Sequence, residues 1–433
     1  MGWRDRLEVY LREKLYPFWF ERVAAPEGGF TTYFDRNGKP TGQTDKTLIQ
    51  QTRSIFMLSH AIRNGYDETD PGQPARAGAG GRPRARALLE QGLPWFLERF
   101  RDPVFDGWFW IVDKTGKPVS TDKIMYGQSF VIYCMSECAL ATGDPRAREA
   151  AEHTFDLAQK YAADTAFGGY REMFLRDWRP RPAGAYGGDR KSFDVHMHLM
   201  EAYTTLYELT RADIHRRKLL EVIEVLWARM MNRATSTGIA QFALDFTPLP
   251  AILFKTVWGS DRDNEGAPRP LNNTSYGHNI ELLWLFLHAL EVLGEKVDPW
   301  RDRLAALADH TLRYGVDPQY GGMYVEGAHD GPARDTQKEF WQQAESLVGL
   351  LDCYLLFREP RYWEAFKKVA GFVWTHMINH EVGEWFALLD RDGTVRWDYL
   401  GHAWKNNYHT TRSMVQTLRR LRRIEEAGLP TPE

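Results

Sequence analysis

Histidine, carboxylate and arginine residues interrupt several apolar segments that are otherwise typical of buried helices. The segment NNTSYGHNIELLW places His278 and Glu281 three residues apart, on one face of a predicted helix. In FDVHMHLM, His198 follows Asp194 by four residues and shares its face, whereas His196 points elsewhere. Such groups can act as helix caps and surface charges, as parts of a metal site, or as acid–base groups. Other polar residues are needed to decide between these uses.

Similar polar residues occur near the start of other apolar helices. Arg53 lies in QQTRSIF, Tyr126 in MYGQSF and His409 in WKNNYH. The chain also holds 16 Trp, and tryptophan faces can bind sugar rings. If these helices start at the same end of the fold, their first turns meet at one cavity. The predicted site comprises Arg53, Tyr126, Asp194, His198, His278, Glu281, Trp341, Trp404 and His409.

The elements that would position this site are about twelve helices in six pairs, predicted from helical periodicity. Between the pairs, Gly–aromatic clusters such as GGFTTYFDRNGKP and FDGWFWIVDKTGKP recur six times and predict short β-hairpins. The even-numbered helices are the more apolar, which predicts an inner ring. We therefore expect an all-α fold, an (α/α)6 barrel with hairpins at one end, as a single domain over residues 1–433. An open α-solenoid is the alternative.

The composition limits the kinds of partner and compartment that the sequence predicts. The formal net charge of −3 does not suggest a nucleic acid partner, and no segment is apolar enough for a membrane span. The three cysteines give no disulfide framework and predict a reducing, cytoplasmic compartment. Residues 70–86 are rich in Gly, Pro and Arg and predict a surface loop. Residues 246–270 predict a long loop that could be a lid or an interface.

Three kinds of chemistry fit the candidate residues. His-x-His and His-x-x-Glu occur in metal sites, but here the residues are spread over five helices, so we expect no metal. A glycoside hydrolase needs two carboxylates about 5 to 10 Å apart, and Glu281, Glu339 and Glu345 could supply them. A sugar-binding module without catalysis would use the same tryptophans.

The third chemistry uses the two histidines His278 and His409. A neutral imidazole can remove the C2 proton of an open-chain sugar aldehyde, which leaves an enediolate, and a second imidazole can return a proton to the other face. Arg53 would stabilise the enediolate oxygen, and the tryptophans would hold the sugar. This chemistry needs no cofactor.

Four segments, KSFDVHMHLMEAYTTLY, SYGHNIELLWL, KEFWQQAES and WKNNYHTTR, together resemble the N-acylglucosamine 2-epimerase superfamily. That superfamily includes cellobiose and mannose 2-epimerases and aldose–ketose isomerases. The resemblance implies an (α/α)6 barrel and cofactor-free epimerisation or isomerisation. It also implies the following roles: His278 and His409 as the acid–base pair in either order, Arg53 and His198 near the reacting oxygens, Glu281 supporting His278, and Trp341 and Trp404 lining the subsite.

Two departures from the cellobiose 2-epimerases bear on the substrate. Asp194 stands where those enzymes usually carry Asn, and Asn406-Asn407 stand where they carry Cys-Pro. The motifs look closer to mannose 2-epimerases, so we expect interconversion of free D-mannose and D-glucose. A disaccharide 2-epimerase and a mannose–fructose isomerase are the alternatives. A small sugar is the expected partner, and the sequence does not predict the oligomeric state.

Overall fold

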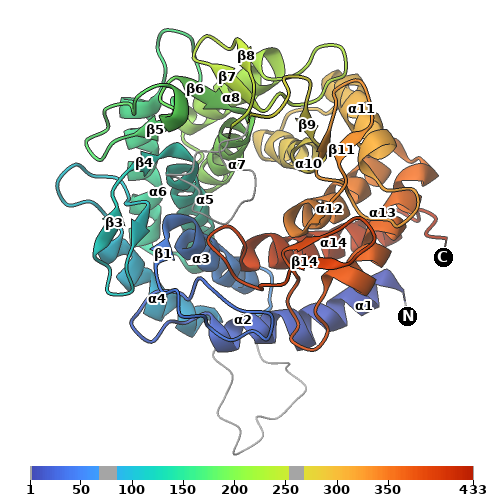
Figure 1. Cartoon of the computed structure of the whole chain (residues 1–433), viewed down its shortest axis with the longest axis horizontal. Coiled ribbons are helices and arrows are strands. Elements are labelled where there is room, and N and C mark those ends of the chain that lie inside the picture. Colours follow the sequence, from blue (N-terminus) through green and yellow to red (C-terminus); the bar gives the residue numbers. More distant parts are fainter. Residues whose placement is uncertain (1, 68–84, 253–267, 433) are drawn as a thin grey trace, which may run out of the picture.

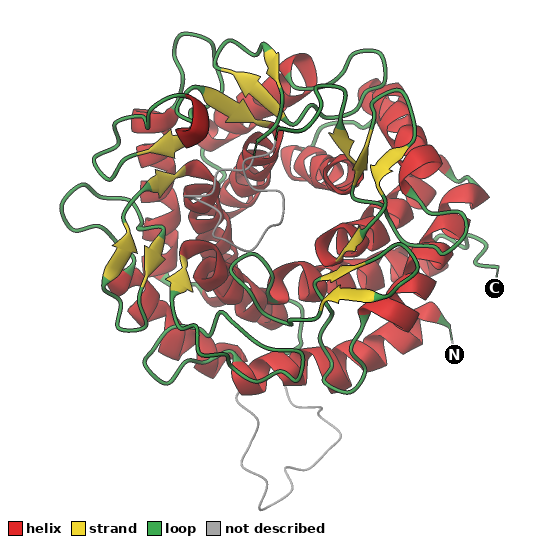
Figure 2. Cartoon of the chain, viewed as in Figure 1, coloured by secondary structure: helices red, strands yellow, loops and turns green. Residues whose placement is uncertain are grey.

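Helices surround the centre of the molecule in a computed structural model that describes residues 2–67, 85–252 and 268–432 (Figures 1 and 2). Each inner helix packs against the next, and the last packs against the first. Among the described residues, the inner helices are α3 (Leu48–Arg63), α5 (Met125–Thr142), α7 (Phe193–Thr210), α10 (Tyr276–Leu293), α12 (Phe340–Phe357) and α14 (Asn407–Glu426).

An outer layer of helices covers this ring, and the outer helices of eight or more residues each pack on an inner neighbour. This layer contains α1 (Trp3–Tyr10), η1 (Leu11–Leu15), α2 (Tyr16–Arg22), α4 (Ala85–Arg99), α6 (Pro145–Leu157), η2 (Ala158–Ala162), α8 (Asp213–Arg229), α11 (Arg301–His310), η5 (Thr311–Gly315), α13 (Pro360–Phe372) and η6 (Val373–Met377). Two short turns of 3-10 helix, η3 (Gly184–Tyr186) and η4 (Asp298–Trp300), complete the helices described. The predicted all-α class and the alternation of inner and outer helices are confirmed.

Helix α14 departs from the prediction that inner helices are the more apolar. Its sequence NYHTTRSMVQTLRRLRRIEE is rich in arginine, yet Arg412 and Arg420 are buried. Arg412 pairs with carboxylates of three other inner helices, and Arg420 pairs with Asp352 of α12 at 2.6 Å. Charged residues can therefore be buried inside the ring because they form ion pairs with residues of opposite charge.

Short strands lie at the end of the ring where the inner helices begin (Figure 1). The strand that leads into an inner helix pairs with a hairpin farther along the chain, as Thr47 pairs with Ile111. The strands are β1 (Lys46–Thr47), β2 (Ile111–Val112), β3 (Pro118–Ser120), β4 (Lys123–Ile124), β5 (Met173–Phe174), β6 (Arg190–Ser192), β7 (Gln241–Ala243), β8 (Pro248–Leu249), β9 (Thr274–Ser275), β10 (Glu326–Gly327), β11 (Ala333–Asp335), β12 (Lys338–Glu339), β13 (Leu388–Leu389) and β14 (Val395–Trp397).

The six predicted hairpins are present in this layer. Four of them form paired strands, β2–β3, β7–β8, β10–β11 and β13–β14. The other two are closed by single antiparallel bridges, Phe34 to Pro40 and Phe174 to Pro180. Phe34 also bridges Gly401, so the first hairpin of the chain lies beside the segment that leads into α14. The hairpin layer thus links a segment near the N-terminus with a segment near the C-terminus.

The fourth residue of an inner helix fastens the helix to the hairpin layer. Gln51 accepts a hydrogen bond from the Phe30 backbone N–H and donates one to the Phe30 carbonyl, both at 2.8 Å. In α7 the same position is His196, whose Nε2 accepts from the Tyr170 N–H at 3.0 Å. His196 is therefore a structural residue, in line with the prediction that it points away from the face of Asp194 and His198. These bonds hold the first turns of the inner helices, where the candidate site lies.

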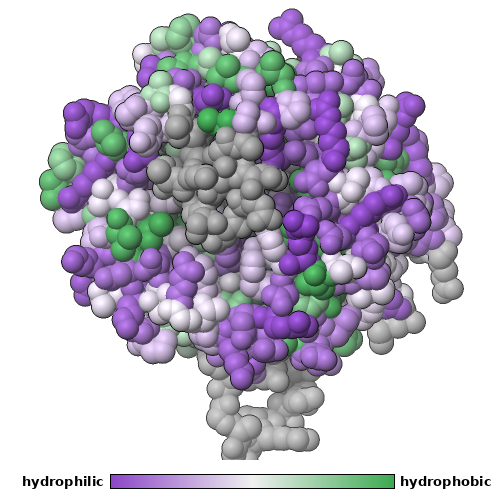
Figure 3. All heavy atoms as spheres, viewed as in Figure 1, coloured by the Kyte–Doolittle hydropathy of each residue, from purple (hydrophilic) through white to green (hydrophobic). Residues whose placement is uncertain are grey.

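Other sequence predictions concern the cysteines, membrane spans and surface loops. Cys134, Cys138 and Cys353 are free and buried. No described helix is long and apolar enough to cross a lipid bilayer. On the face in Figure 3, the hydrophobic side chains of the described residues form small, separate groups among polar ones. The predicted loops at 70–86 and 246–270 fall largely outside the described residues, so their predicted roles are untested.

Candidate active site

All nine predicted residues line one cavity of about 190 Å³ at the start of the inner helices. Six inner helices start at this end, so residues far apart in sequence meet there. The contributing elements are α3 with Arg53, α5 with Tyr126, α7 with Asp194 and His198, α10 with His278 and Glu281, α12 with Trp341, the segment before α14 with Trp404, and α14 with His409. Their predicted meeting at one cavity agrees with the structure, while their roles remain predictions.

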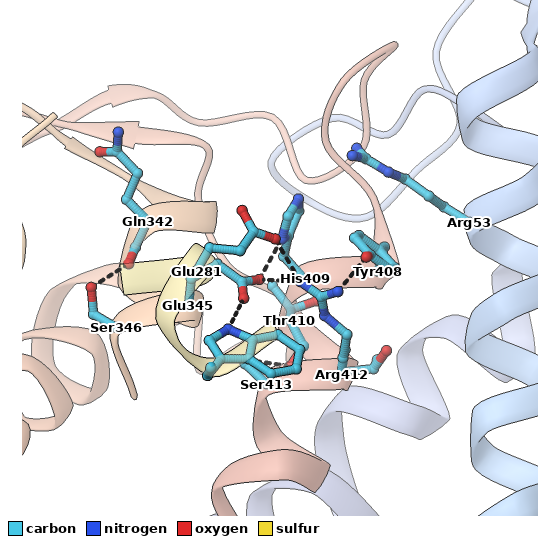
Figure 4. Close-up of polar contacts among 12 residues, drawn as sticks. Arg53, Glu281, Gln342, Glu345, Ser346, Tyr408, His409, Thr410, Arg412 and Ser413 are labelled. Atoms are coloured by element: carbon cyan, nitrogen blue, oxygen red, sulfur yellow. Dashed lines mark hydrogen bonds and ion pairs between the residues drawn. The ribbon is translucent and has the colours of Figure 1, made fainter. Parts of the chain in front are cut away.

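His409 is held by a buried carboxylate. Its Nδ1 lies 2.6 Å from Oε1 of Glu345 (Figure 4). Because a carboxylate can only accept, Nδ1 carries the hydrogen and Nε2 keeps a lone pair. Burial lowers the pKa of His409 to about 3, although the nearby Glu345 opposes this shift. His409 is therefore neutral at physiological pH, so that Nε2 keeps its lone pair, although so low a pKa makes it a weak base.

Arg412 joins the carboxylates of three inner helices. Its Nη2 donates to Oε1 of Glu281 at 2.9 Å and to Oε1 of Glu345 at 2.8 Å (Figure 4). Its Nη1 donates to Glu201 and to the hydroxyl of Tyr408. All of these side chains are buried. One guanidinium thus supplies the positive charge for a cluster of carboxyl groups below the cavity.

The two carboxyl groups on Nη2 of Arg412 differ in protonation. Burial alone would raise the pKa of Glu345, but the charge of Arg412 and the bond from His409 lower it to about 2. Burial, together with the neighbouring Glu345, raises the pKa of Glu281 well above its ordinary value. Glu345 is therefore the ionised member of this coupled pair and Glu281 the one that holds its proton.

His198 has the same kind of support as His409. Its Nδ1 lies 2.9 Å from Oε2 of Glu201, so that nitrogen donates and Nε2 is left to face other groups. Tyr126 lies beside it, with the hydroxyl 3.5 Å from Nε2. Arg53 donates to that hydroxyl from Nη2 and to the Trp404 carbonyl from Nη1, both at 3.1 Å. Arg53 and His198 are thus fixed side by side on the cavity wall.

His278 lies at the half-buried edge of the same cavity. The backbone N–H of His278 donates to Oγ of Ser275 at 3.3 Å, so Ser275 caps the start of α10. The Trp341 ring lies 4.6 Å from the His278 ring and 6.0 Å from the His409 ring, measured between centroids. Trp341 therefore contacts both histidines of the predicted acid–base pair.

Two further predictions concern the placement of Asp194 and His198 and the role of Glu281. Asp194 and His198 both line the cavity, as their shared helix face predicted. The prediction that Glu281 supports His278 is not tested by the hydrogen bond described for Glu281, which comes from Arg412. The role of Glu281 toward His278 stays a prediction.

Sequence reasoning missed Arg412 and Glu201. A signal was available, because Glu201 follows His198 by three residues, as Glu281 follows His278, and Arg412 follows His409 by the same interval. A residue three positions after an inward-facing histidine faces inward too. The sequence indicated only one role for Glu345, that of a possible hydrolase carboxylate.

Glu281, Glu345 and His409 place one potential ligand atom each within 4.8 Å of one another, which could suit a metal ion. However, Arg412 already donates to both carboxylates. A divalent cation between them would be repelled by that guanidinium and would compete with it for the same oxygens. The donor set is therefore better explained as an ion-pair cluster.

Comparisons with known proteins identify the family of this chain. Residues 74–413 match the family model of N-acylglucosamine 2-epimerase (GlcNAc 2-epimerase). A cellobiose 2-epimerase of Bacteroides fragilis is 27% identical over 96% of this chain and 98% of its own. A D-mannose isomerase of Marinomonas mediterranea is 25% identical over 96% and 97%. The structure of cellobiose 2-epimerase from Spirochaeta thermophila superimposes with a TM-score of 0.82 at 27% identity, over 98% of this chain and 97% of that one.

These similarities show which class of protein this is: a carbohydrate epimerase or isomerase. The chain belongs to the N-acylglucosamine 2-epimerase family, because the family model covers most of its length. The resemblance predicted from the four sequence motifs is thereby confirmed.

Proposed function

We propose that this protein is a cofactor-free 2-epimerase that interconverts D-mannose and D-glucose, with His278 and His409 as the proton-transfer pair. The observation that supports this most is the neutral His409, anchored through Nδ1 on Glu345, in the same cavity as His278. Trp341 contacts both rings, so a sugar at Trp341 would have both imidazoles within reach.

In this proposal the sugar reacts in its open-chain form. One histidine removes the C2 proton, and the electrons of the C–H bond pass to the C1 carbonyl oxygen to give an enediolate. The other histidine delivers a proton to the opposite face of C2, which restores the aldehyde with inverted configuration. Because the reaction is reversible, each histidine is the base in one direction and the acid in the other.

Arg53 and His198 are proposed to bind the reacting oxygens. Arg53 is 2% exposed, and its Nε–H has no acceptor among the described residues. An enediolate oxygen would supply an acceptor and a negative charge at this donor. Tyr126 lies between the two side chains and would hold them in place.

The glycoside hydrolase alternative loses Glu345, one of its three candidate carboxylates. Glu345 is completely buried and already accepts from His409, Arg412 and Trp284. A glycosidase needs two carboxyl groups that flank the scissile bond in contact with substrate. Glu345 does not line the cavity, whereas Glu281 and Glu339 do, so a hydrolase would have to use those two.

A free hexose is the proposed substrate. The cavity of about 190 Å³ is smaller than the roughly 300–1,000 Å³ that is usual for drug-sized ligands. Asp194, which stands where cellobiose 2-epimerases usually carry Asn, lines this cavity. We also propose that the ring of inner helices is a closed (α/α)6 barrel and that residues 1–433 form one domain, since α14 packs against α3.

Turnover of D-mannose in D2O tests the proposal. We expect D-glucose as the main product, with deuterium at C2. D-fructose as the main product would show an isomerase instead, and turnover of cellobiose but not of mannose would show a disaccharide epimerase.

A further inference from the structure

Three residues of the cavity wall carry a buried polar atom without a hydrogen-bond partner among the described residues. These atoms are Nε of Arg53, Oδ1 of Asn273 and Oε1 of Gln342. The residues are only 2%, 5% and 1% exposed. A buried polar atom without a partner is unfavourable, and native proteins satisfy nearly all of them. Since these residues line the cavity, a bound molecule is the natural source of partners for the three atoms.

The chemical type of these atoms limits what they can bind. The guanidinium of Arg53 donates, as the proposed function uses it, whereas the other two atoms are neutral amide oxygens that only accept. The orientation of the Gln342 amide is fixed, because its Nε2 donates to the Val325 carbonyl at 3.1 Å. Asn273 and Gln342 therefore require two donors from the ligand. On a neutral sugar, such donors are hydroxyl groups.

Both acceptors lie next to the start of α10, which carries His278. Asn273 directly precedes strand β9, and β9 leads into that helix. Gln342 packs against Gly277, since a Cβ built there would lie 2.5 Å from Gln342 Cγ. The Val325 carbonyl accepts from both Gln342 and the backbone N–H of Tyr276, which ties Gln342 to this helix start. A sugar held by these acceptors would lie within reach of His278.

We propose that Asn273 Oδ1 and Gln342 Oε1 each accept a hydrogen bond from one hydroxyl group of the bound sugar and thereby select hexoses in which both hydroxyls are free. This inference rests on the proposed function for its substrate. It assigns to this chain two specificity residues in addition to the proton-transfer pair. A sugar that lacks one of the hydroxyls would leave a buried oxygen unpaired and be rejected.

Monodeoxy derivatives of mannose at C3, C4 and C6 test this proposal. For the wild-type enzyme we expect kcat/KM to fall about 10- to 100-fold for two of these sugars. Asn273→Leu and Gln342→Met remove one acceptor each at similar side-chain size. Each variant should lose most activity on mannose but treat mannose and one particular deoxy sugar alike, within about threefold. The deoxy sugar that is no longer rejected identifies the hydroxyl bound.

Matched controls are available nearby. Asn272 is exposed and Gln337 half-buried, and neither lines the cavity. Asn272→Leu and Gln337→Met should reject the deoxy sugars as the wild type does. If Asn273→Leu unfolds, Asn273→Asp keeps an acceptor oxygen and should still reject the same sugars; if Gln342→Met unfolds, the Asn273 variants decide the test.

Unchanged rejection of every deoxy sugar by both acceptor variants would overturn the proposal. A wild-type enzyme that turns over no mannose would instead contradict the proposed function. In that case the same comparison, made with deoxy forms of the sugar that is turned over, still decides whether the two acceptors read hydroxyl groups.

Discussion

Nδ1 of His409 lies 2.6 Å from Oε1 of Glu345, and the same carboxylate oxygen accepts from Arg412 at 2.8 Å. The histidine and the arginine stand one helical turn apart on α14, and Glu345 comes from α12. Glu345 thus fixes the tautomer of His409, and Arg412 keeps Glu345 ionised. The predictions about catalysis follow from this arrangement.

Replacing Glu345 by Gln should lower kcat by about 100-fold or more, the usual contribution of a positioned acid–base group. The variant keeps the side-chain shape but loses the charge that fixes the His409 tautomer. Steady-state kinetics with mannose measure the loss. Glu425→Gln, an exposed change on the same chain, should leave kcat unchanged. Full activity of Glu345→Gln would show that His409 does not depend on this carboxylate.

The pH profile should reflect the low pKa of His409. Burial lowers that pKa to about 3, so the state in which both histidines are protonated and neither can act as base forms only in acid. Activity should therefore persist as the pH falls below 6.5, the ordinary pKa of histidine. The acid limb of kcat/KM locates this step. An acid limb at or above pH 6.5 would contradict a buried neutral His409.

Arg412→Met should destabilise the fold by about 3–5 kcal/mol, because it leaves buried carboxylates without their counter-charge. Thermal or denaturant unfolding measures this change. Arg422→Met removes an exposed arginine from the same helix and should cost no more than about 1 kcal/mol. Similar stability of the two variants would mean that the carboxyl groups are neutral without Arg412.

Treatment with a chelator should leave activity unchanged. Arg412 already donates to Glu281 and Glu345, the two carboxyl groups that a metal would need. Assays after dialysis against EDTA, with and without added divalent cations, test this expectation. Loss of activity that is restored by one cation would show a metal at this cluster.

The sequence allowed the positions of the nine cavity residues to be predicted because helical periodicity and repeat order determine which helix ends meet. His196 and His198 show what helical periodicity can predict. Their spacing correctly separates a structural histidine from a histidine that lines the cavity. The partners of Arg412 could not be predicted, since Glu201 and Glu345 lie 211 and 67 residues away in the sequence. Which charges meet across the ring depends on side-chain packing.

The unpaired oxygens of Asn273 and Gln342 were equally inaccessible from sequence. Whether a buried amide is satisfied depends on which loop backbone lies against it, as the Val325 carbonyl does for Gln342. The prediction that inner helices are the more apolar is wrong for α14 for a related reason: buried arginines can replace apolar residues where carboxylates pair with them.

The central claim is that His278 and His409 act on opposite faces of C2, and single-histidine variants in D2O test it most directly. His278→Asn and His409→Asn should each abolish epimerisation but keep hydrogen exchange at C2 of one sugar. One variant should exchange only mannose and the other only glucose, because each retains one base. Near-full epimerisation by either variant, or exchange of both sugars by the same variant, would contradict the two-histidine account.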